Sequence, residues 1–242
     1  METVELTIDG KKVTAPKGST ILEAARKNGI DIPALCYHEG ISPYGACRLC
    51  MVEINEGGRD RLVASCIYEA KDGLEVRTST ERVNRVRRMA MELLLARCPR
   101  SEVIRQMAAK VGVERTRFPE RPPEKDDNCI LCGLCVRACR EVVGVSAIGF
   151  AYRGSKREVA TPFHESPELC IGCGTCAYVC PTGCITFEDK GNVRVIWGRE
   201  FEMQKCKVCG RYFAPVAQLE YIRKKAGLPE GFFDVCPDCR SS

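Results

Sequence analysis

One twelve-residue pattern occurs twice in the chain, first as CILCGLCVRACR from Cys129 to Arg140 and then as CIGCGTCAYVCP from Cys170 to Pro181. In both copies the four cysteines are separated by three, three and four positions. Thiols so close together on a tight loop point toward a common centre and are poorly placed to form disulfides with distant partners. The repeated spacing therefore indicates metal binding.

Cysteine usage as a whole supports this interpretation. The chain has 242 residues, enough for one to three small domains, and 16 of its 18 cysteines fall into four groups of four, with only Cys98 and Cys184 outside. The first residues, METVELTIDG, are acidic where a signal peptide is basic and then apolar, and no apolar run reaches the length of a membrane span. We therefore expect a cytoplasmic chain without membrane insertion, in a reducing compartment where grouped cysteines bind metals.

The formal net charge of +5 favours nucleic-acid binding only while the cysteines are counted as neutral. Metal-bound thiolates stay ionised, so each four-cysteine centre carries about −2, and four centres bring the total to about −3. The basic surplus then mostly offsets the charge of the chain's own centres. We therefore expect no nucleic-acid partner.

The N-terminal region has the pattern of a hairpin followed by a helix. Apolar and polar residues alternate from Thr3 to Thr14, with Asp9–Gly10 as the turn. In the next segment, STILEAARKNG, Thr20 and Glu23 form a capping box and Gly29 is suited to end the helix in a left-handed conformation. The residues expected to face the core are Val4, Leu6, Ile8, Ile21, Leu22, Ala24 and Ala25. This order predicts a β-grasp domain.

Four cysteines follow with gaps of ten, two and fifteen residues. They are Cys36, Cys47, Cys50 and Cys66. The plant-type [2Fe–2S] spacing has four residues in its first gap, so this motif departs from that group. It resembles the longer-gap [2Fe–2S] domain that opens the iron–sulfur subunits of respiratory complex I, of many [FeFe] hydrogenases and of NAD-linked hydrogenase diaphorases. The resemblance implies that the four cysteines are cluster ligands; zinc, which four thiolates also suit, is the alternative.

Two helices are expected next. The segment ERVNRVRRMAMELLLARCPR has helical periodicity that Pro99 ends, and SEVIRQMAAKVGV begins a second helix at Ser101. The expected apolar positions of the first helix are Val83, Val86, Ala90, Leu93 and Leu94. Its arginines are expected on a solvated face. They are Arg82, Arg85, Arg87 and Arg88.

Members of the family that the first domain resembles often carry an extra [4Fe–4S] cluster at this point, held by one histidine and three cysteines. This segment has only Cys98 and no histidine, so we expect no cluster in it. The proline-rich, charged stretch FPERPPEKDDN at 118–128 then marks a boundary.

The two repeats fit the bacterial two-cluster ferredoxin pattern, in which three closely spaced cysteines hold one cubane and the fourth is donated to the other. The predicted ligands of the first [4Fe–4S] cluster are Cys129, Cys132, Cys135 and Cys180. Those of the second are Cys170, Cys173, Cys176 and Cys139. Arg140 stands where a simple ferredoxin usually has proline; diaphorase-type subunits share this departure, which favours a module bound in a complex.

The C-terminal tail contains the knuckles CKVCG and CPDC, separated by 26 residues. Their cysteines are Cys206, Cys209, Cys236 and Cys239. Two-knuckle spacing indicates one metal ion, which is zinc in a ribbon-like tail or a single iron in a rubredoxin-like site. Arg240 after the last cysteine and the helical appearance of QLEYIRKKAGLPEG favour zinc.

The expected fold is α+β, in four parts. These are a β-grasp [2Fe–2S] domain at 1–78, a helical linker without a cluster at 79–122, a two-[4Fe–4S] ferredoxin-like domain at 123–195 and a zinc-binding tail at 196–242. From Val4 to about Asp189 this order resembles the small iron–sulfur subunit of NAD(P)-linked hydrogenases and of related electron-bifurcating complexes. The resemblance implies a flavin- and NAD(P)-binding iron–sulfur subunit as partner, with a hydrogenase, formate dehydrogenase or ferredoxin at the other end.

No glycine-rich dinucleotide fingerprint or nucleophile constellation occurs in the sequence. We therefore expect an electron-transfer subunit without an active site of its own. Two alternatives remain, a free multi-cluster ferredoxin and a redox-sensing, metal-binding regulator.

Overall fold

The computed structural model describes residues 2–123 and 128–240. The chain divides into two compact units, Met1–Leu134 and Cys135–Ser242. Residues 124–127 of the expected connector, Met1 of the expected β-grasp domain and residues 241–242 of the expected tail lie outside the described residues.

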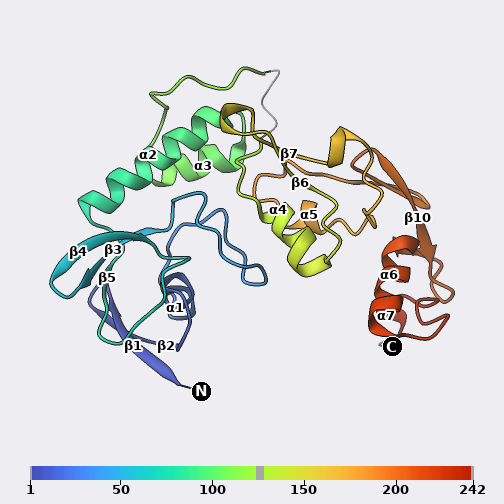
Figure 1. The fold of residues 1–242 in the computed structure, drawn as a ribbon, viewed down its shortest axis with the longest axis horizontal. Coiled ribbons are helices and arrows are strands. Elements are labelled where there is room, and N and C mark those ends of the chain that lie inside the picture. The colour runs from blue at the N-terminus through green and yellow to red at the C-terminus, as the bar shows by residue number, and fades with distance from the viewer. Residues whose placement is uncertain (1, 124–127, 241–242) are drawn as a thin grey trace. The chain divides into compact units, whose positions relative to one another are not determined.

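The first unit is built on a mixed five-stranded sheet with the order β2-β1-β5-β3-β4 (Figure 1). The strands are β1 (Thr3–Ile8), β2 (Lys11–Pro16), β3 (Met51–Glu56), β4 (Arg59–Ala64) and β5 (Glu75–Arg77). In the β1–β2 hairpin Ile8 pairs with Lys11, so Asp9 and Gly10 form the expected two-residue turn, both with positive φ. β1 pairs in parallel with β5, which agrees with the β-grasp interpretation.

Helix α1 (Ile21–Lys27) has the predicted capping box. The Thr20 hydroxyl accepts a hydrogen bond from the Glu23 backbone N–H at 3.3 Å, and the Glu23 carboxylate accepts one from the Thr20 N–H at 2.8 Å. Gly29 follows the helix with a φ of 70°. All seven residues expected to face the core are buried. Local signals therefore predicted this part correctly.

Helices α2 (Glu81–Arg97) and α3 (Glu102–Lys110) follow and pack against each other (Figure 1). The N-cap of α2 is Thr80, whose hydroxyl accepts a hydrogen bond from the Val83 N–H at 3.2 Å. The helix ends at Arg97, with Cys98 as its C-cap directly before Pro99, as predicted. The start of α3 after Ser101 is also confirmed.

The predicted inner face of α2 is wrong at two positions. Leu93 is 51% exposed, whereas Arg87, expected in solvent, is 8% exposed. The buried row of α2 runs at intervals of four residues, through Val83, Arg87, Met91 and Leu95. Hydrophobic periodicity misplaces this face because an arginine belongs to the buried row and a leucine does not.

The second unit contains two small sheets. β6 (Gly149–Ala151) pairs with β7 (Glu158–Ala160), and a four-stranded sheet has the order β11-β10-β9-β8. The strands of the larger sheet are β8 (Glu188–Lys190), β9 (Val193–Ile196), β10 (Arg199–Lys205) and β11 (Tyr212–Pro215). This one sheet joins strands from both sides of the expected tail boundary, because β8 precedes residue 196 whereas β10 and β11 follow it.

Short helical elements carry the cysteine repeats. They are α4 (Leu134–Arg137), the π-helix η2 (Ala138–Val143) that continues it, the 3₁₀ turns η3 (Gly154–Lys156) and η4 (Pro162–His164), and α5 (Thr175–Tyr178). In the tail, α6 (Val216–Ala226) packs on β10 and β11, and α7 (Pro237–Arg240) ends the described chain. The helix expected in the tail is thus present as α6, with Gly227 in a left-handed conformation after it. Across residues 2–123 and 128–240, no helix is long and apolar enough to cross a lipid bilayer.

Candidate metal centres

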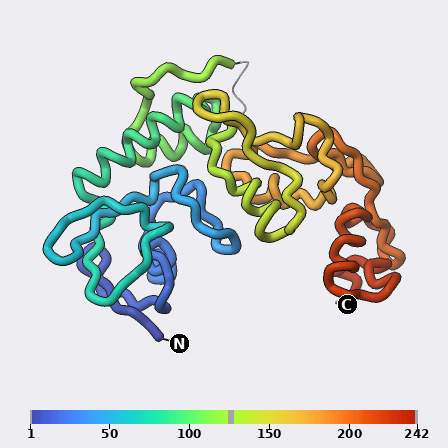
Figure 2. The backbone as a smooth tube through the Cα atoms, viewed as in Figure 1, coloured from blue at the N-terminus to red at the C-terminus, as the bar shows by residue number. Residues whose placement is uncertain are grey.

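The four cysteines of the expected [2Fe–2S] site meet in the first unit. Cys36, Cys47 and Cys50 lie on the long loop between α1 and β3, which Figure 2 shows as an irregular trace, and Cys66 follows β4. All four are buried. The Cys47 backbone N–H donates to the Cys36 sulfur at 3.4 Å, and the Leu35 N–H donates to the Cys47 sulfur at 3.5 Å. The loop thus turns backbone donors toward sulfur, as iron–sulfur ligands require.

Because these thiols form hydrogen bonds with one another, the pKa values of two of them are lowered and those of the other two are raised. Hydrogen bonds from the thiols of Cys47 and Cys66 lower the pKa of Cys36 to about 2, and one from Cys66 lowers the pKa of Cys50 to about 6. The pKa values of Cys47 and Cys66 are raised, because their protons are held in those bonds. Four thiolates at this distance require cations between them, which is the charge that iron supplies. The donor set therefore fits the cluster.

A buried cation lies against the same loop. The Arg87 guanidinium donates from Nε to the Leu49 carbonyl at 3.0 Å and from Nη2 to the Met51 carbonyl at 2.8 Å, the two residues that flank Cys50. Within the described part of the chain no carboxylate forms an ion pair with Arg87, and burial lowers its pKa. A buried cation without a counter-charge is unfavourable. An anionic cluster on Cys50, if held there as predicted, would supply that charge.

The second cubane's four expected ligands also meet. Cys139 from η2 and three cysteines from the second repeat line one small cavity of about 20 Å³ in the second unit. Those three are Cys170, Cys173 and Cys176. The Ala147 backbone N–H donates to the Cys139 sulfur at 3.2 Å. The structure therefore brings Cys139 beside cysteines more than thirty positions away, as ligand crossing requires.

Burial dominates the acidity of this site. It raises the pKa of Cys176 to about 11, an effect partly offset by a hydrogen bond from the Trp197 indole N–H, and it also raises the pKa of Cys170. Thiols that resist ionisation in a closed cavity become thiolates only with a cation present. The site thus fits a metal cluster and is a poor site for an isolated thiolate.

The residues expected to hold the first cubane are divided between the two units. Cys129 and Cys132 belong to the first unit, whereas Cys135 and Cys180 belong to the second. Their shared ligation therefore stays a prediction. Beside Cys129, the Arg97 Nε donates to the Cys129 carbonyl at 2.6 Å, while the buried Nη2 has no acceptor among the described residues. A buried donor without an acceptor suits a neighbouring anionic group.

The tail cysteines form a compact set. The sulfurs of Cys206, Cys209, Cys236 and Cys239 all lie within 4.8 Å of one another. Ligands about 2.3 Å from a metal at tetrahedral corners are about 3.8 Å apart, and the sulfurs of Cys209 and Cys236 are 3.9 Å apart. Backbone N–H groups of Cys236 and Cys209 lower the pKa of Cys206 to about 6. This geometry fits one tetrahedral metal ion.

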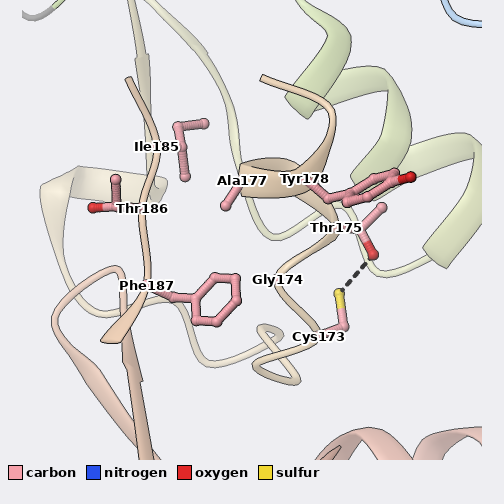
Figure 3. A pocket seen from close by; sticks show the side chains of 8 residues that line it. All are labelled: Cys173, Gly174, Thr175, Ala177, Tyr178, Ile185, Thr186 and Phe187. Carbon is pink, nitrogen blue, oxygen red and sulfur yellow. Dashed lines mark hydrogen bonds between the residues drawn. The ribbon is translucent and has the colours of Figure 1, made fainter. Parts of the chain in front are cut away.

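An apolar pocket of about 550 Å³ lies beside the second cubane's cysteines. Figure 3 shows Cys173 at its edge, with a hydrogen bond of 3.3 Å between its sulfur and the Thr175 hydroxyl. Phe187 lines the same pocket, and so does Tyr178, whose side chain is 84% exposed. The pocket thus brings solvent-accessible apolar surface up to one of the expected ligands.

Sequence reasoning missed two side chains that touch these sites. Arg87 is expected in solvent because it lies away from the predicted apolar stripe of its helix. Trp197, the only tryptophan of the chain, lines the cavity of the second cubane although it precedes the tail knuckles. A single tryptophan directly before a turn glycine, in VIWGR, was the available signal. The sequence pattern does not indicate that Trp197 contacts Cys176, which lies 21 positions earlier in the chain.

Two family models match the chain. Residues 1–81 match a 2Fe-2S iron-sulfur cluster binding domain, and residues 125–187 match a 4Fe-4S dicluster domain. Together they agree with the cluster types inferred from the two kinds of cysteine spacing.

The chain is also similar to curated proteins and to a solved structure. It is 35% identical to the NADPH-Fe(3+) oxidoreductase subunit alpha of Geobacter sulfurreducens, over 90% of this chain and 28% of that protein. It is 35% identical to the NADP-reducing hydrogenase subunit HndD of Solidesulfovibrio fructosivorans, over 76% of this chain and 36% of that protein. The chain thus spans about a quarter to a third of the length of these relatives.

A crystal structure of an NAD+-reducing [NiFe]-hydrogenase in the H2-reduced state matches with a TM-score of 0.62 and 30% identity, over 74% of this chain and 85% of that one. Sequence, domains and fold therefore agree. The chain belongs to the family of small, diaphorase-type iron–sulfur subunits of NAD(P)-linked hydrogenase complexes, which resemble the large iron–sulfur subunit of complex I.

Proposed function

We propose that this chain relays single electrons between a flavin-containing NAD(P)H oxidoreductase subunit and a second redox partner. The observation that supports it most directly is the gathering of Cys139 with the three cysteines of the second repeat around one cavity. Shared ligands of this kind belong to paired cubanes, whose proximity suits electron transfer. Two independent structural zinc sites would not require each repeat to donate a cysteine to the other.

The chain's residues would hold three clusters that accept and release electrons one at a time. The [2Fe–2S] ligands are the buried cysteines of the α1–β3 loop with Cys66, and the two cubanes use the crossed sets given above. Backbone N–H groups of Leu35, Cys47 and Ala147 hold the ligand sulfurs in place. The apolar pocket beside Cys173 is a surface on which a partner approaches the second cubane without water between them.

The partners are proposed from the family. The relatives named above are an NADPH-Fe(3+) oxidoreductase, an NADP-reducing hydrogenase and an NAD+-reducing hydrogenase. A hydride donor delivers two electrons at once, and a flavin is the usual cofactor that separates them. We therefore place a flavin- and NAD(P)-binding subunit on one side, and a hydrogenase, formate dehydrogenase or ferredoxin on the other, in a complex for which electron bifurcation is one mode of action.

In the tail we propose zinc rather than iron. The four sulfurs fit a tetrahedral ion of either metal, but Arg240 follows Cys239, where a rubredoxin-like site usually repeats glycine, and the residues between the knuckles form β11 and the helix α6. A structural zinc ion supplies on the order of 10 kcal/mol of folding free energy to a segment with little core of its own.

Anaerobic assembly followed by metal analysis and a reduction assay tests this function. We expect about ten irons, as many acid-labile sulfides and about one zinc per chain. Alone, the chain should not be reduced by NAD(P)H; together with its flavoprotein partner it should be. Turnover of NAD(P)H by the isolated, flavin-free chain would contradict the proposal.

Purification from the native cell separates this proposal from its rivals. A complex member brings a flavin-containing subunit with it, a free ferredoxin comes alone, and a regulator brings nucleic acid. About eleven irons without zinc would assign a single iron to the tail.

A further inference from the structure

Trp197 occupies a turn that does not suit a bulky residue. It lies between β9 and β10, where Ile196 pairs with Arg199 and only Trp197 and Gly198 form the turn. Their φ angles are 55° and 70°, in the left-handed region, which asparagine and glycine adopt readily and large side chains do not. Such conformations persist only where surrounding contacts hold them, and they concentrate at functional sites.

The strained turn directs the indole toward the cubane cavity. The Trp197 Nε1–H donates a hydrogen bond to the Cys176 sulfur at 3.5 Å, which is its only acceptor among the described residues. The ring also lines the cavity formed with the four cysteines of the second set. Trp197 therefore contacts the expected ligand sphere although it lies 21 positions beyond Cys176.

The neighbouring residues clamp the turn onto the second repeat. Arg199 donates from Nη1 to three backbone carbonyls of the loop that leads to the repeat, at 2.7 to 3.1 Å. These carbonyls belong to Pro167, Glu168 and Cys170. Phe201 lies so close to Gly172 that a Cβ on this glycine would be 2.7 Å from the ring. The position of Trp197 is thus built into the packing of this unit.

We propose that Trp197 is a positioning residue that sets the reduction potential of the second cubane through its N–H···S hydrogen bond to Cys176. A hydrogen bond to a ligand sulfur offsets the extra negative charge of the reduced cluster and so raises its potential. The inference rests on the proposed electron-transfer function, because it assumes that Cys176 ligates a cluster. It assigns to the start of the tail a role in tuning that cluster, beyond holding a metal ion.

The single tryptophan allows a direct test on the intact chain. We would label the indole nitrogen with nitrogen-15, assemble the clusters anaerobically, reduce them and record electron–nuclear double resonance. One cubane should show a weak nitrogen-15 coupling. If both cubanes are assembled and reduced but neither shows this coupling, the inference is overturned while the electron-transfer function stands; absence of the cubanes would instead contradict the proposed function.

Midpoint potentials provide the second measurement. Trp197→Phe keeps an aromatic ring but removes the N–H donor. The midpoint potential of the cubane that shows the nitrogen-15 coupling should therefore move to a more negative value, while the other two clusters keep their potentials. Tyr221→Phe is the matched control: its hydroxyl donates to the Val143 carbonyl at 2.8 Å, also from the tail to the cluster region, but touches no sulfur. It should leave all three potentials unchanged.

An unchanged potential in a Trp197→Phe chain with full iron content would refute the tuning role, and so would an equal shift of both cubanes. If Trp197→Phe instead lowers the iron content, the measurement is repeated with 3-benzothienylalanine at position 197. This side chain has nearly the shape of indole and lacks the N–H, so a shifted potential supports the inference and an unshifted one overturns it.

Discussion

The β-grasp region and the region around the second cubane hold their cysteines in different ways. In the first, a continuous set of buried apolar side chains from the sheet and α1 forms a core, and only Cys50 and Cys66 of the cluster ligands belong to it. In the second, the buried members of the core are Cys135, Ile148, Cys176, Ile196 and Phe201. Two of these five are cysteines. Ile196 and Phe201 come from β9 and β10, strands of the sheet that extends into the tail.

This contrast indicates that the β-grasp region has enough apolar core to fold without its cluster, whereas the region around the second cubane needs its cluster for stability. An apolar side chain contributes about 1.5–3 kcal/mol when it is fully buried, so the first core has many such contributions and the second has few. Small segments without enough core are commonly stabilised by metal sites. We therefore expect the β-grasp region to fold without its metal and the second unit to need its metals and its tail.

Removing all metals should have the largest effect and would break the comparison if both regions responded alike. Because metal binding is worth on the order of 10 kcal/mol and a small core only about 3–5 kcal/mol, the metal-free second unit should unfold. Hydrogen exchange followed by mass spectrometry should show loss of amide protection in β6 to β11 and retention in β1 to β5. Continued protection of β9 and β10 in the metal-free chain would remove the distinction.

Single ligand substitutions test the same contrast site by site. Cys47→Ser should lower the iron content from about ten to about eight while the β-grasp sheet stays protected from exchange. Cys139→Ser should lower it to about six and weaken protection in the second unit, because a cubane and part of the core are lost together. Iron analysis and hydrogen exchange on the same samples measure both effects.

The second variant also tests ligand crossing. Cys139 is the last of the four cysteines in the first repeat. Loss of only the cubane predicted on Cys129, Cys132, Cys135 and Cys180 would therefore show that Cys139 ligates its neighbours in sequence. Site-resolved spectroscopy should instead show loss of the cluster on Cys170, Cys173 and Cys176, which share its cavity.

How far the sequence predicted the structure follows the same division. The Asp9–Gly10 turn, the Thr20–Glu23 capping box and the end of α2 before Pro99 depend on residues a few positions apart, and all three are confirmed. Cysteine spacing likewise predicted the sets that meet in one place, since metal geometry limits the spacings that work. Both kinds of signal are local or are imposed by chemistry.

The missed features depend on contacts between distant segments. Arg87 is buried because two carbonyls beside Cys50 accept its hydrogen bonds, and Trp197 reaches Cys176 because Arg199 and Phe201 hold the β9–β10 turn. No periodicity encodes either contact. Charge even misleads for Arg87, since an arginine that donates to two backbone carbonyls tolerates burial far better than its type suggests.

A substitution of Arg87 tests how the β-grasp region contacts the expected [2Fe–2S] site at Cys50. Arg87→Met should leave two buried carbonyls without donors and destabilise the first unit by about 3 kcal/mol. It should also alter the electron paramagnetic resonance spectrum of the reduced [2Fe–2S] cluster, since Arg87 donates to the carbonyls of both residues that flank Cys50. The neighbouring, exposed Arg88→Met should change stability by no more than about 0.5 kcal/mol. Equal effects of the two substitutions would show that the burial of Arg87 has no energetic role.

The smallest expected effect concerns the start of α2, the helix that carries Arg87. Thr80→Ala removes the hydroxyl that accepts a hydrogen bond from the Val83 N–H, and loss of such a cap costs about 1 kcal/mol. The matched control is Ser101→Ala at the N-cap of α3, where the side chain makes no capping hydrogen bond, so no capping energy is lost and the cost should be smaller. Denaturant unfolding followed through the first unit measures both. Because α2 holds Arg87 against the loop of Cys50, the Thr80 variant should also release [2Fe–2S] iron faster to a chelator, whereas the Ser101 variant should not. If the two variants lost iron at the same rate, the link from helix start to cluster loop would be wrong, and the first unit would hold its cluster through the sheet core alone.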